Sequence, residues 1–504
     1  MRGFWVAVAV MAGSGLVSAQ VIFESRYYTG PEVEEYASSV VPLEDGFMVS
    51  GTINDSTGNG YLLLLRLTEN GDVLWGRSYS YLGPINVTSS ALVSDVFVVS
   101  GVMFPPAFTQ GFLSAFDLNG ENLWNLIFPD IVSSINSIVP SDSSVIFTGY
   151  WYLDATIVYQ VLGEVDLTGT LTWGYCYSAP LGPWGLDVDV ARDGSILVAG
   201  YLGTLGVSFP IYLAKFGPDG VPLWAVKMSE NAYMPSVYCS LLPDGSTVMV
   251  WPTWDGNLTK IAKFNGDGNL VAARAFADPM GGVLYPEDLI VGDDGYPLIV
   301  FTRPTYEDGS FIVDLKLRDD LGVLKAHYIT GLYPLNAHIN SGAATDFGYV
   351  LAGECTAGAP YLKDVAVVTL DQEGSSCLDE EVTMLDSVCE VGSESIDLGV
   401  AFPLELLSFS CQEMGDLQFD VANICSMTPV AEAGKPINTA VGFRAVGGAG
   451  YLVIEADHPT RISVYSVDGR KVFGGHVSAR LELPLASGVY IVKSGRHTAR
   501  AVVF

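Results

Sequence analysis

The stretch Gly60–Tyr79, with the sequence GYLLLLRLTENGDVLWGRSY, contains the unit that decides the fold. Two apolar segments flank a tight turn at Glu69-Asn70-Gly71, and Trp75 follows shortly after the turn glycine. Short apolar runs on either side of an Asn-Gly turn are typical of two antiparallel β-strands. The stretch therefore predicts a β-hairpin with one large indole ring on its second strand.

This hairpin recurs along most of the chain with a period of about 50 residues. An acidic turn and the end of an apolar strand recur in step with it, which gives each unit four strands. Seven such units predict an all-β fold, a seven-bladed β-propeller over residues 20–374. The turn glycines that mark the units are Gly71, Gly120, Gly169, Gly220, Gly268, Gly322 and Gly374.

A tryptophan occupies the same place after the turn in four units, as Trp75, Trp124, Trp173 and Trp224. One large ring at a fixed position predicts packing between neighbouring blades and not a cofactor role. Arg274 and His327 stand at similar places in the next two units. The seventh unit lacks a strand after Gly374, and we expect residues 21–28 to supply it, because their sequence is similar to that of residues 73–79. Closing the ring in this way limits exposed strand edges.

The run Phe116–Trp124 has an apolar strand, then Asp-x-x-Gly, then the tryptophan. It resembles the tryptophan-docked blades of quinoprotein-like propellers and the repeats of secreted bacterial propellers. The resemblance implies the fold and not an activity, because one fold hosts unrelated functions. A quinone-dependent dehydrogenase needs a cage of Arg, Asp or Lys that we cannot assemble from the sequence, and no cofactor is expected.

The first 19 residues have the pattern of a secretory signal peptide. Arg2 precedes the apolar run Phe4–Ala12, and small residues lead to an expected cleavage after Ala19. A membrane anchor is the alternative, but the run is short for a span. No later segment reaches about 18 uninterrupted apolar residues, so no transmembrane segment is expected in the mature chain. The net charge of −32 argues against binding to nucleic acid or to anionic lipid.

Residues 375–427 break the repeat and are predicted to form an acidic linker. The segment has eleven acidic residues, no Lys or Arg, and the cysteines Cys377, Cys389, Cys411 and Cys425. An even set of cysteines in an exported chain predicts two disulfides, although the sequence leaves their pairing open. We favour the nested pairs Cys377–Cys425 and Cys389–Cys411. Zinc is the alternative, but no CxxC or paired histidine accompanies them, and no metal is expected.

The three other cysteines, Cys176, Cys239 and Cys355, lie in propeller strands and are predicted to be buried free thiols.

Residues 428–504 are predicted to form a separate small Ig-like β-sandwich. This end carries a charge near +4, against near −36 for the rest of the chain. Strands are expected at Tyr451–Ala456, around a turn at Val467-Asp468-Gly469, and at Leu481–Leu485, Gly488–Lys493 and Ala499–Phe504. The runs Ile462–Val472 and Leu485–Val492 resemble the type A C-terminal sorting domain of the type IX secretion system. The resemblance implies secretion machinery as a partner and a secreted or outer-surface location; a related module that is not a transport signal is the alternative.

The propeller offers little catalytic chemistry in its sequence. It has only two histidines, His327 and His338, and no Gly-x-Ser-x-Gly elbow or phosphate loop. No catalytic residue is predicted, and the expected function is non-enzymatic binding or adhesion at the cell surface. The alternative is an extracellular hydrolase or lyase that degrades a polymer.

Aromatic residues are concentrated in the longer connections, which share one face of a propeller. Exposed rings on one face predict a recognition surface for a glycan or protein ligand. The alternative is that these rings pack against neighbouring loops. The candidate ligand-binding residues are Trp151, Trp251, Trp254, Tyr201 and Tyr306.

Overall fold

The structure is a computed structural model in which all described elements are β-strands. The chain divides into two compact units, Met1–Pro429 and Val430–Phe504. The predicted signal peptide, residues 1–19, lies outside the described residues. The structure describes residues 22–503 except for 30–32, 107–108, 129–131, 153–156, 204–208, 233–235, 255–257, 279–283, 293, 306–308, 330–336, 347, 357–362, 377–378, 382–383, 390, 397, 405–406, 409–410, 418–419, 428–442, 449–450, 457–459, 467–470, 478–479, 485–487 and 495–496.

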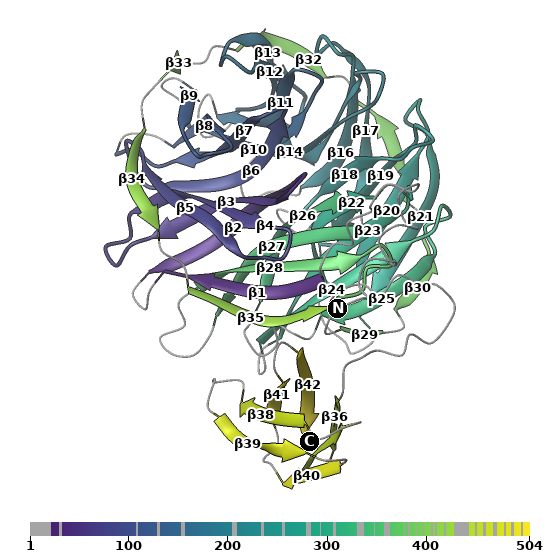
Figure 1. Cartoon of the computed structure of the whole chain (residues 1–504). Helices are drawn as coiled ribbons and strands as arrows, with labels where there is room; N and C mark the ends of the chain where they lie inside the picture. The colour runs from purple at the N-terminus through teal and green to yellow at the C-terminus, as the bar shows by residue number, and fades with distance from the viewer. Residues whose placement is uncertain are drawn as a thin grey trace, which may run out of the picture. The chain divides into compact units, whose positions relative to one another are not determined.

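The first unit is a seven-bladed β-propeller, as the repeat predicted (Figure 1). Each blade is an antiparallel meander that runs from an inner to an outer strand. From inside outwards, blades one to six are β2 (Glu34–Leu43), β3 (Gly46–Asn54), β4 (Gly60–Thr68), β5 (Val73–Ser80); β6 (Ile85–Val93), β7 (Val96–Met103), β8 (Gln110–Asp117), β9 (Asn122–Ile127); β10 (Val132–Pro140), β11 (Ser144–Tyr152), β12 (Val158–Asp166), β13 (Leu171–Ser178); β14 (Pro183–Val190), β15 (Ile196–Leu202), β16 (Pro210–Phe216), β17 (Pro222–Asn231); β18 (Tyr238–Leu241), β19 (Thr247–Pro252), β20 (Thr259–Phe264), β21 (Leu270–Ala277); and β22 (Tyr285–Val291), β23 (Pro297–Thr305), β24 (Gly309–Leu317), β25 (Val323–Ile329).

The ring is closed by the N-terminal strand, which confirms the prediction for residues 21–28. Blade seven consists of β26 (His338–Thr345), β27 (Gly348–Thr356), β28 (Lys363–Asp371) and then β1 (Ile22–Tyr28), and β1 pairs antiparallel with β28. Tyr27 donates a hydrogen bond to the Gly71 carbonyl of blade one at 2.7 Å. Tyr177 of blade three makes the same bond to Gly220 of blade four at 2.6 Å. The matching bonds show that β1 serves as the outer strand of an ordinary blade.

Residues 375–427 do not form a separate linker, and this prediction is corrected. The segment runs backwards around the propeller and adds a fifth, antiparallel strand to the outer edge of every blade (Figure 1). We call this segment the belt. Its strands pair in turn with blades six, five, four, three, two, one and seven: β29 (Asp379–Glu381), β30 (Leu385–Val388), β31 (Ser393–Ser395), β32 (Gly399–Pro403), β33 (Leu407–Ser408), β34 (Gln412–Leu417) and β35 (Asp420–Met427).

The belt is fixed by five apolar anchors, each in a different gap between blades. The anchors recur every six or seven residues and join the hydrophobic clusters between blades, from the gap of blades five and six to that of blades one and two. Burying such side chains stabilises the belt, while its backbone covers strand edges that would otherwise be open. The anchors are Met384, Val391, Leu398, Leu404 and Cys411.

This path separates the belt cysteines, so the predicted Cys389–Cys411 disulfide is wrong. Neither residue is in a disulfide; Cys389 packs in the cluster of blades four and five, and Cys411 in that of blades one and two. The side chains of Cys377 and Cys425 lie outside the described part, and their pairing stays a prediction. The free, buried state predicted for the cysteines of the propeller strands is confirmed for Cys176, Cys239 and Cys355.

The repeated tryptophans fill the gaps between blades, as predicted. A Cβ added to Gly220 would lie 2.6 Å from the Trp173 ring of the preceding blade, and one added to Gly268 would lie 2.8 Å from Trp224. The glycine therefore provides both a positive φ, 78° at Gly220, and the close approach that an indole needs. Trp75 and Trp124 lie against Gly120 and Gly169 in the same way.

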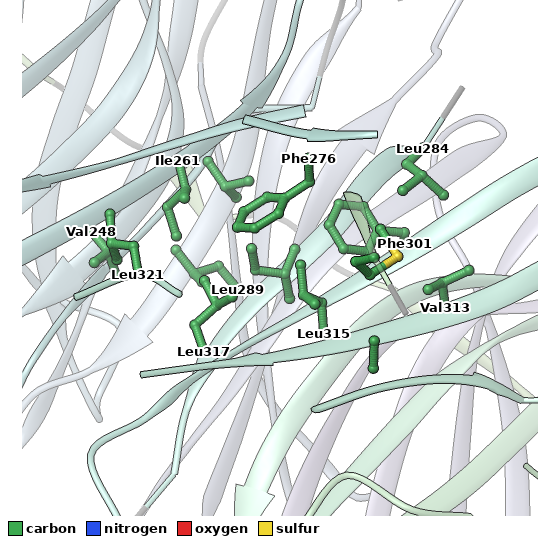
Figure 2. Packing of buried hydrophobic residues seen from close by; sticks show 14 of the residues in the cluster. Val248, Ile261, Phe276, Leu284, Leu289, Phe301, Val313, Leu315, Leu317 and Leu321 are labelled. Carbon is green, nitrogen blue, oxygen red and sulfur yellow. The ribbon is translucent and has the colours of Figure 1, made fainter. Parts of the chain in front are cut away.

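The gap between blades five and six is filled differently. The strand register places Ala272 at the tryptophan position of blade five and Lys325 at that of blade six, so Arg274 and His327 are not its equivalents, contrary to expectation. The left-handed turn position of blade six is Leu321, with φ 63°, and not Gly322. Leu321 is fully buried in the cluster between the two blades (Figure 2). The partly buried Ala272 packs against the same cluster.

The second unit contains two small antiparallel sheets. One has the order β36-β37-β40 and the other β39-β38-β41-β42, in agreement with the predicted strands. The bounds are β36 (Phe443–Gly448), β37 (Tyr451–Ala456), β38 (Thr460–Ser466), β39 (Lys471–Val477), β40 (Arg480–Pro484), β41 (Gly488–Ser494) and β42 (His497–Val503). The turn predicted at Val467-Asp468-Gly469 lies outside the described residues.

Candidate functional site at the mouth of the central channel

The inner strands of the propeller surround a central channel, and six of them have a β-bulge near their start. A bulge inserts one extra residue and redirects its side chain. The bulged residues line the channel at one level, and five of the six are polar. They are Ser38, Thr88, Asn136, Leu186, Glu287 and Asn340.

Three of the bulged side chains join their blade to the next. Asn340 donates from Nδ2 to the Ala37 carbonyl at 2.7 Å, and Asn136 donates in the same way to the Gly185 carbonyl at 2.7 Å. Thr88 donates to the carbonyl of the next blade at 2.6 Å. These bonds satisfy carbonyl groups that the bulges remove from the strand ladder. This layer of the channel is therefore structural.

The next layer contains half-buried carboxylates that are also structural. Asp187 Oδ2 accepts from the Cys239 amide at 2.8 Å, and Asp288 Oδ2 accepts from the Gly342 amide at 2.6 Å. Burial raises the pKa of Asp187 to about 7 and that of Asp288 to about 6, although the amide hydrogen bonds act in the opposite direction. Since each carboxylate accepts bonds from the neighbouring blade, both are committed to holding the ring together.

Above these layers the channel opens into a polar cavity of about 550 Å³. This cavity, which we call the mouth, lies at the end where β2 begins and where β27 leads to β28. Its polar side chains come from inner strands of several blades and from blade seven. The bulged Thr88, Asn136, Glu287 and Asn340 line its base, and the other polar side chains are Tyr36, Asn86, Tyr238, His338, Glu354 and Lys363.

Two ion pairs define the chemistry of the mouth. His338 Nε2 lies 3.1 Å from Glu287 Oε1, and Lys363 Nζ lies 2.8 Å from Glu354 Oε1. Lys363 also lies over the Tyr36 ring, 5.4 Å from its centroid. The mouth thus presents a phenol ring beside charged groups that donate and accept hydrogen bonds.

The pKa values of both His338 and Glu287 are raised above their ordinary values. Burial raises the pKa of Glu287, although the bond from His338 opposes this. Burial also works to lower the pKa of His338, but the hydrogen bond and charge of Glu287 outweigh it and raise that pKa. The pair can therefore hold a proton at pH values where an isolated histidine would release it.

The structure separates the residues that the sequence proposed for ligand binding. Trp251 has an exposed fraction of 0% and Tyr201 one of 3%, so both pack in the core and neither has a surface for a ligand. This corrects the prediction for these two residues. Trp254 is 55% exposed and Trp151 is half-buried beside Tyr159. Tyr306 lies outside the described residues.

The buried rings belong to a continuous row of aromatic contacts across blades three to five. Trp184 lies 4.3 Å from Tyr150 and 4.9 Å from Tyr201, measured between ring centroids. Phe209 continues the row at 5.2 Å from Tyr201 and ends it against Trp254 at 6.2 Å. Leu186, which lines the mouth, packs against this cluster. The aromatic row therefore begins at the mouth and ends in one exposed indole.

The polar residues of the mouth were missed by sequence reasoning. Tyr36, Asn86 and His338 each lie two residues before the bulged residue of an inner strand, and Glu287 is itself a bulged residue. A polar residue that interrupts the apolar pattern once per repeat was the available signal. Among the described residues, no group of three or more His, Cys, Asp or Glu could hold a metal ion. The described part also has no helix that could cross a membrane.

No protein-family model matches the chain, and no curated protein matches it. Among solved structures, the β-propeller domain of the trilobed protease from Pyrococcus furiosus is 12% identical, with a TM-score of 0.38, over 72% of this chain and 96% of that one. A subtype N10 neuraminidase-like protein of A/little yellow-shouldered bat/Guatemala/060/2010 is 9% identical, with a TM-score of 0.38, over 56% and 91%. An exo-beta-1,3-galactanase from Phanerochaete chrysosporium is 12% identical, with a TM-score of 0.32, over 72% and 93%. Likenesses at this level concern the fold alone.

Proposed function

We propose that this propeller is a non-enzymatic binding protein that takes its ligand at the mouth of the central channel. The observation that carries the proposal is the convergence of polar side chains from several blades on one open cavity of about 550 Å³. Cavities of several hundred cubic ångströms with a few oriented polar groups are the usual form of a ligand site. The layers beneath the mouth are rigid, because hydrogen bonds between blades already use their polar groups.

The ligand class that suits the mouth is an oligosaccharide. Amide, carboxylate and ammonium groups bond to sugar hydroxyls, and an aromatic face such as that of Tyr36 packs against the apolar face of a sugar ring. The aromatic row offers a second stacking surface at Trp254, further out on the same face. A glycan of several sugars would reach from the mouth towards this indole.

The same proposal includes export and a location at the cell surface. The signal-peptide pattern of residues 1–19 supports entry into the secretory route. The resemblance of the C-terminal unit to a type A sorting domain supports passage through the type IX secretion machinery. Replacing the Gly488–Val492 run with a polar sequence is expected to retain the protein inside the cell, and fractionation of the producing strain would measure this.

A glycan array screened with the purified protein tests the binding proposal, followed by calorimetry with the strongest glycan. We expect His338→Gln and Glu354→Gln to weaken binding by about three- to tenfold each, the range for one lost hydrogen bond. Asp95→Asn is the control, because Asp95 is exposed in the β6–β7 turn at the other end of the channel. Equal affinity for all these variants and the wild type would contradict the proposal.

A glycoside hydrolase is the second candidate, favoured by the raised pKa of Glu287 beside the charge of Glu354. Two carboxyl groups in one site, one of them with a raised pKa, are the usual equipment for glycoside hydrolysis. Incubation of the protein with the glycans that it binds, followed by a reducing-end assay, separates the two candidates. Release of reducing ends that Glu287→Gln abolishes would favour hydrolysis over binding alone.

A further inference from the structure

Glu35 is a fully buried carboxyl group at the place where blade seven meets blade one. It lies on β2, directly before the mouth residue Tyr36, and points away from the mouth because successive strand residues face opposite sides. Ala37, two residues further on the same face, packs in the hydrophobic cluster that joins the two blades. Tyr27 of the closing strand β1 belongs to this cluster as well. Glu35 therefore stands at the end of an apolar seam that closes the ring.

Only one oxygen of Glu35 has a hydrogen-bond partner among the described residues. Oε1 accepts from the backbone amide of Thr29 at 2.8 Å and from the Thr29 hydroxyl. Oε2 is buried and has no described partner. An ionised carboxylate with an unpaired buried oxygen is costly, whereas the neutral acid avoids most of that cost. The site thus favours the protonated form.

The charged groups that act on Glu35 lie on blade seven. Arg26 of β1 pairs with Asp364 of β28 at 2.5 Å, and the two charges have opposite effects on Glu35. The Lys363–Glu354 pair belongs to the mouth. Burial raises the pKa of Glu35 to about 7; the bonds from Thr29 and the charge of Arg26 lower it, and the charge of Asp364 raises it.

We propose that Glu35 is a proton-operated latch on the closure of the propeller. In the protonated state it holds Thr29, the residue that follows β1, against the inner strand of blade one. Ionisation leaves a buried charge at the seam, and the closing strand opens more readily from the ring. The effect is confined to blade seven. There β1 pairs with β28 on one side and with the last belt strand β35 on the other.

Hydrogen exchange of the full chain between pH 5 and pH 8 tests the latch, after correction for the intrinsic pH dependence of amide exchange. We expect the protection of β1 to fall as the pH rises from 5 to about 7, by up to about tenfold per pH unit, the limit for one released proton, and to level off above pH 7. The strand β12 of blade three serves as an internal reference and should keep its protection. Unchanged protection of β1, or an equal loss in both strands, would overturn the proposal.

Two variants separate the effect of Glu35 from that of other titrating groups. Glu35→Gln keeps the size of the side chain and cannot ionise, so the protection of β1 should no longer depend on pH. Glu34→Gln is the matched control on the preceding residue and should behave as the wild type. If Glu35→Gln fails to fold, the pH dependence of hydrogen-exchange protection in β1, compared with that in β12 of the wild type, still tests the proposal. A pH dependence of β1 that persists in Glu35→Gln would assign the effect to another group and overturn the latch.

Discussion

At the scale of single residues, the gap between blades five and six departs from the repeat at two positions. A small residue replaces the tryptophan and a large one replaces the glycine, so that the volume in the gap is conserved. Four gaps use a tryptophan against a glycine, such as Trp173 against Gly220. In the fifth, Ala272 leaves space and Leu321 fills it from the opposite side, at φ 63°. A left-handed conformation costs a leucine about 1–2 kcal/mol, which burial of the side chain offsets. The repeat therefore tolerates a broken motif where volume is conserved.

Leu321→Gly is expected to lower the free energy of unfolding by about 1–3 kcal/mol, because the lost core contact exceeds the relieved strain. Ala272→Trp alone should also destabilise, since its ring would meet the leucine. The double variant Ala272→Trp with Leu321→Gly recreates the pair of the other blades and should recover stability. Urea denaturation of all four proteins measures the coupling, and strictly additive effects would contradict the account.

The buried carboxyl groups predict that the propeller loses stability as the pH rises. Glu35 and Asp187 have a pKa near 7 and Asp288 near 6, each raised above its unfolded value. Their stabilising contribution is complete below about pH 4 and is lost as the pH rises through 6 and 7. Asp193 and Asp244 have a lowered pKa, so acid below about pH 4 removes their contribution.

Thermal unfolding across the pH range measures this balance, and the highest Tm is expected near pH 5. Asp187→Asn should reduce the fall of Tm between pH 5 and pH 8. A wild-type Tm that rises from pH 5 to pH 8 would be incompatible with these raised pKa values.

At the scale of elements, the belt shows what sequence reasoning could and could not supply. Apolar anchors such as Val391 and Leu398 recur at the interval of one blade, but the belt strands are only two to eight residues long. A run such as Ser393–Ser395 has no strand pattern of its own, because its pairing depends on an edge that exists only after the ring forms. The four cysteines of this acidic segment therefore led to the prediction of a disulfide-bearing linker in place of belt strands.

Removal of the belt is expected to destabilise the propeller. A chain that ends after Ser376 exposes the outer edges of all blades and the anchor sites between them, so its Tm should fall by several degrees and it should aggregate. A chain that ends after Met427 lacks only the C-terminal unit and is the control. Equal Tm and equal solubility of the two chains would show that the belt contributes nothing.

The pair Cys377–Cys425 stays a prediction that peptide mapping under non-reducing conditions can decide. The first and last belt strands lie on neighbouring blades six and seven, which is the arrangement that such a disulfide needs. We expect the Cys377 and Cys425 peptides to be linked and the Cys389 and Cys411 peptides to be free. A link between Cys389 and Cys411 would contradict the described path of the belt.

At the scale of the whole molecule, the sequence predicted the ring but not its use. Turn glycines such as Gly71 mark all seven repeats and tryptophans such as Trp75 mark four of them, and together they indicated the number of blades and the packing role of the indoles. The mouth depends on residues such as Glu287 and His338 that meet only when the ring closes. Trp251 could not be told from an exposed ring, because a strand end can face either a loop or the core.

The central structural claim is a ring that carries one belt strand on each blade, and engineered disulfides test it most directly. Lys227 of blade four pairs with Glu394 of the belt, so the double variant Lys227→Cys with Glu394→Cys should form a cross-link on mild oxidation. Arg77 of blade one lies opposite Asp416, so Arg77→Cys with Glu394→Cys should not. Mass spectrometry of the digested proteins identifies the linked peptides. The observed strand pairing predicts the first link and not the second; the reverse result would contradict the belt.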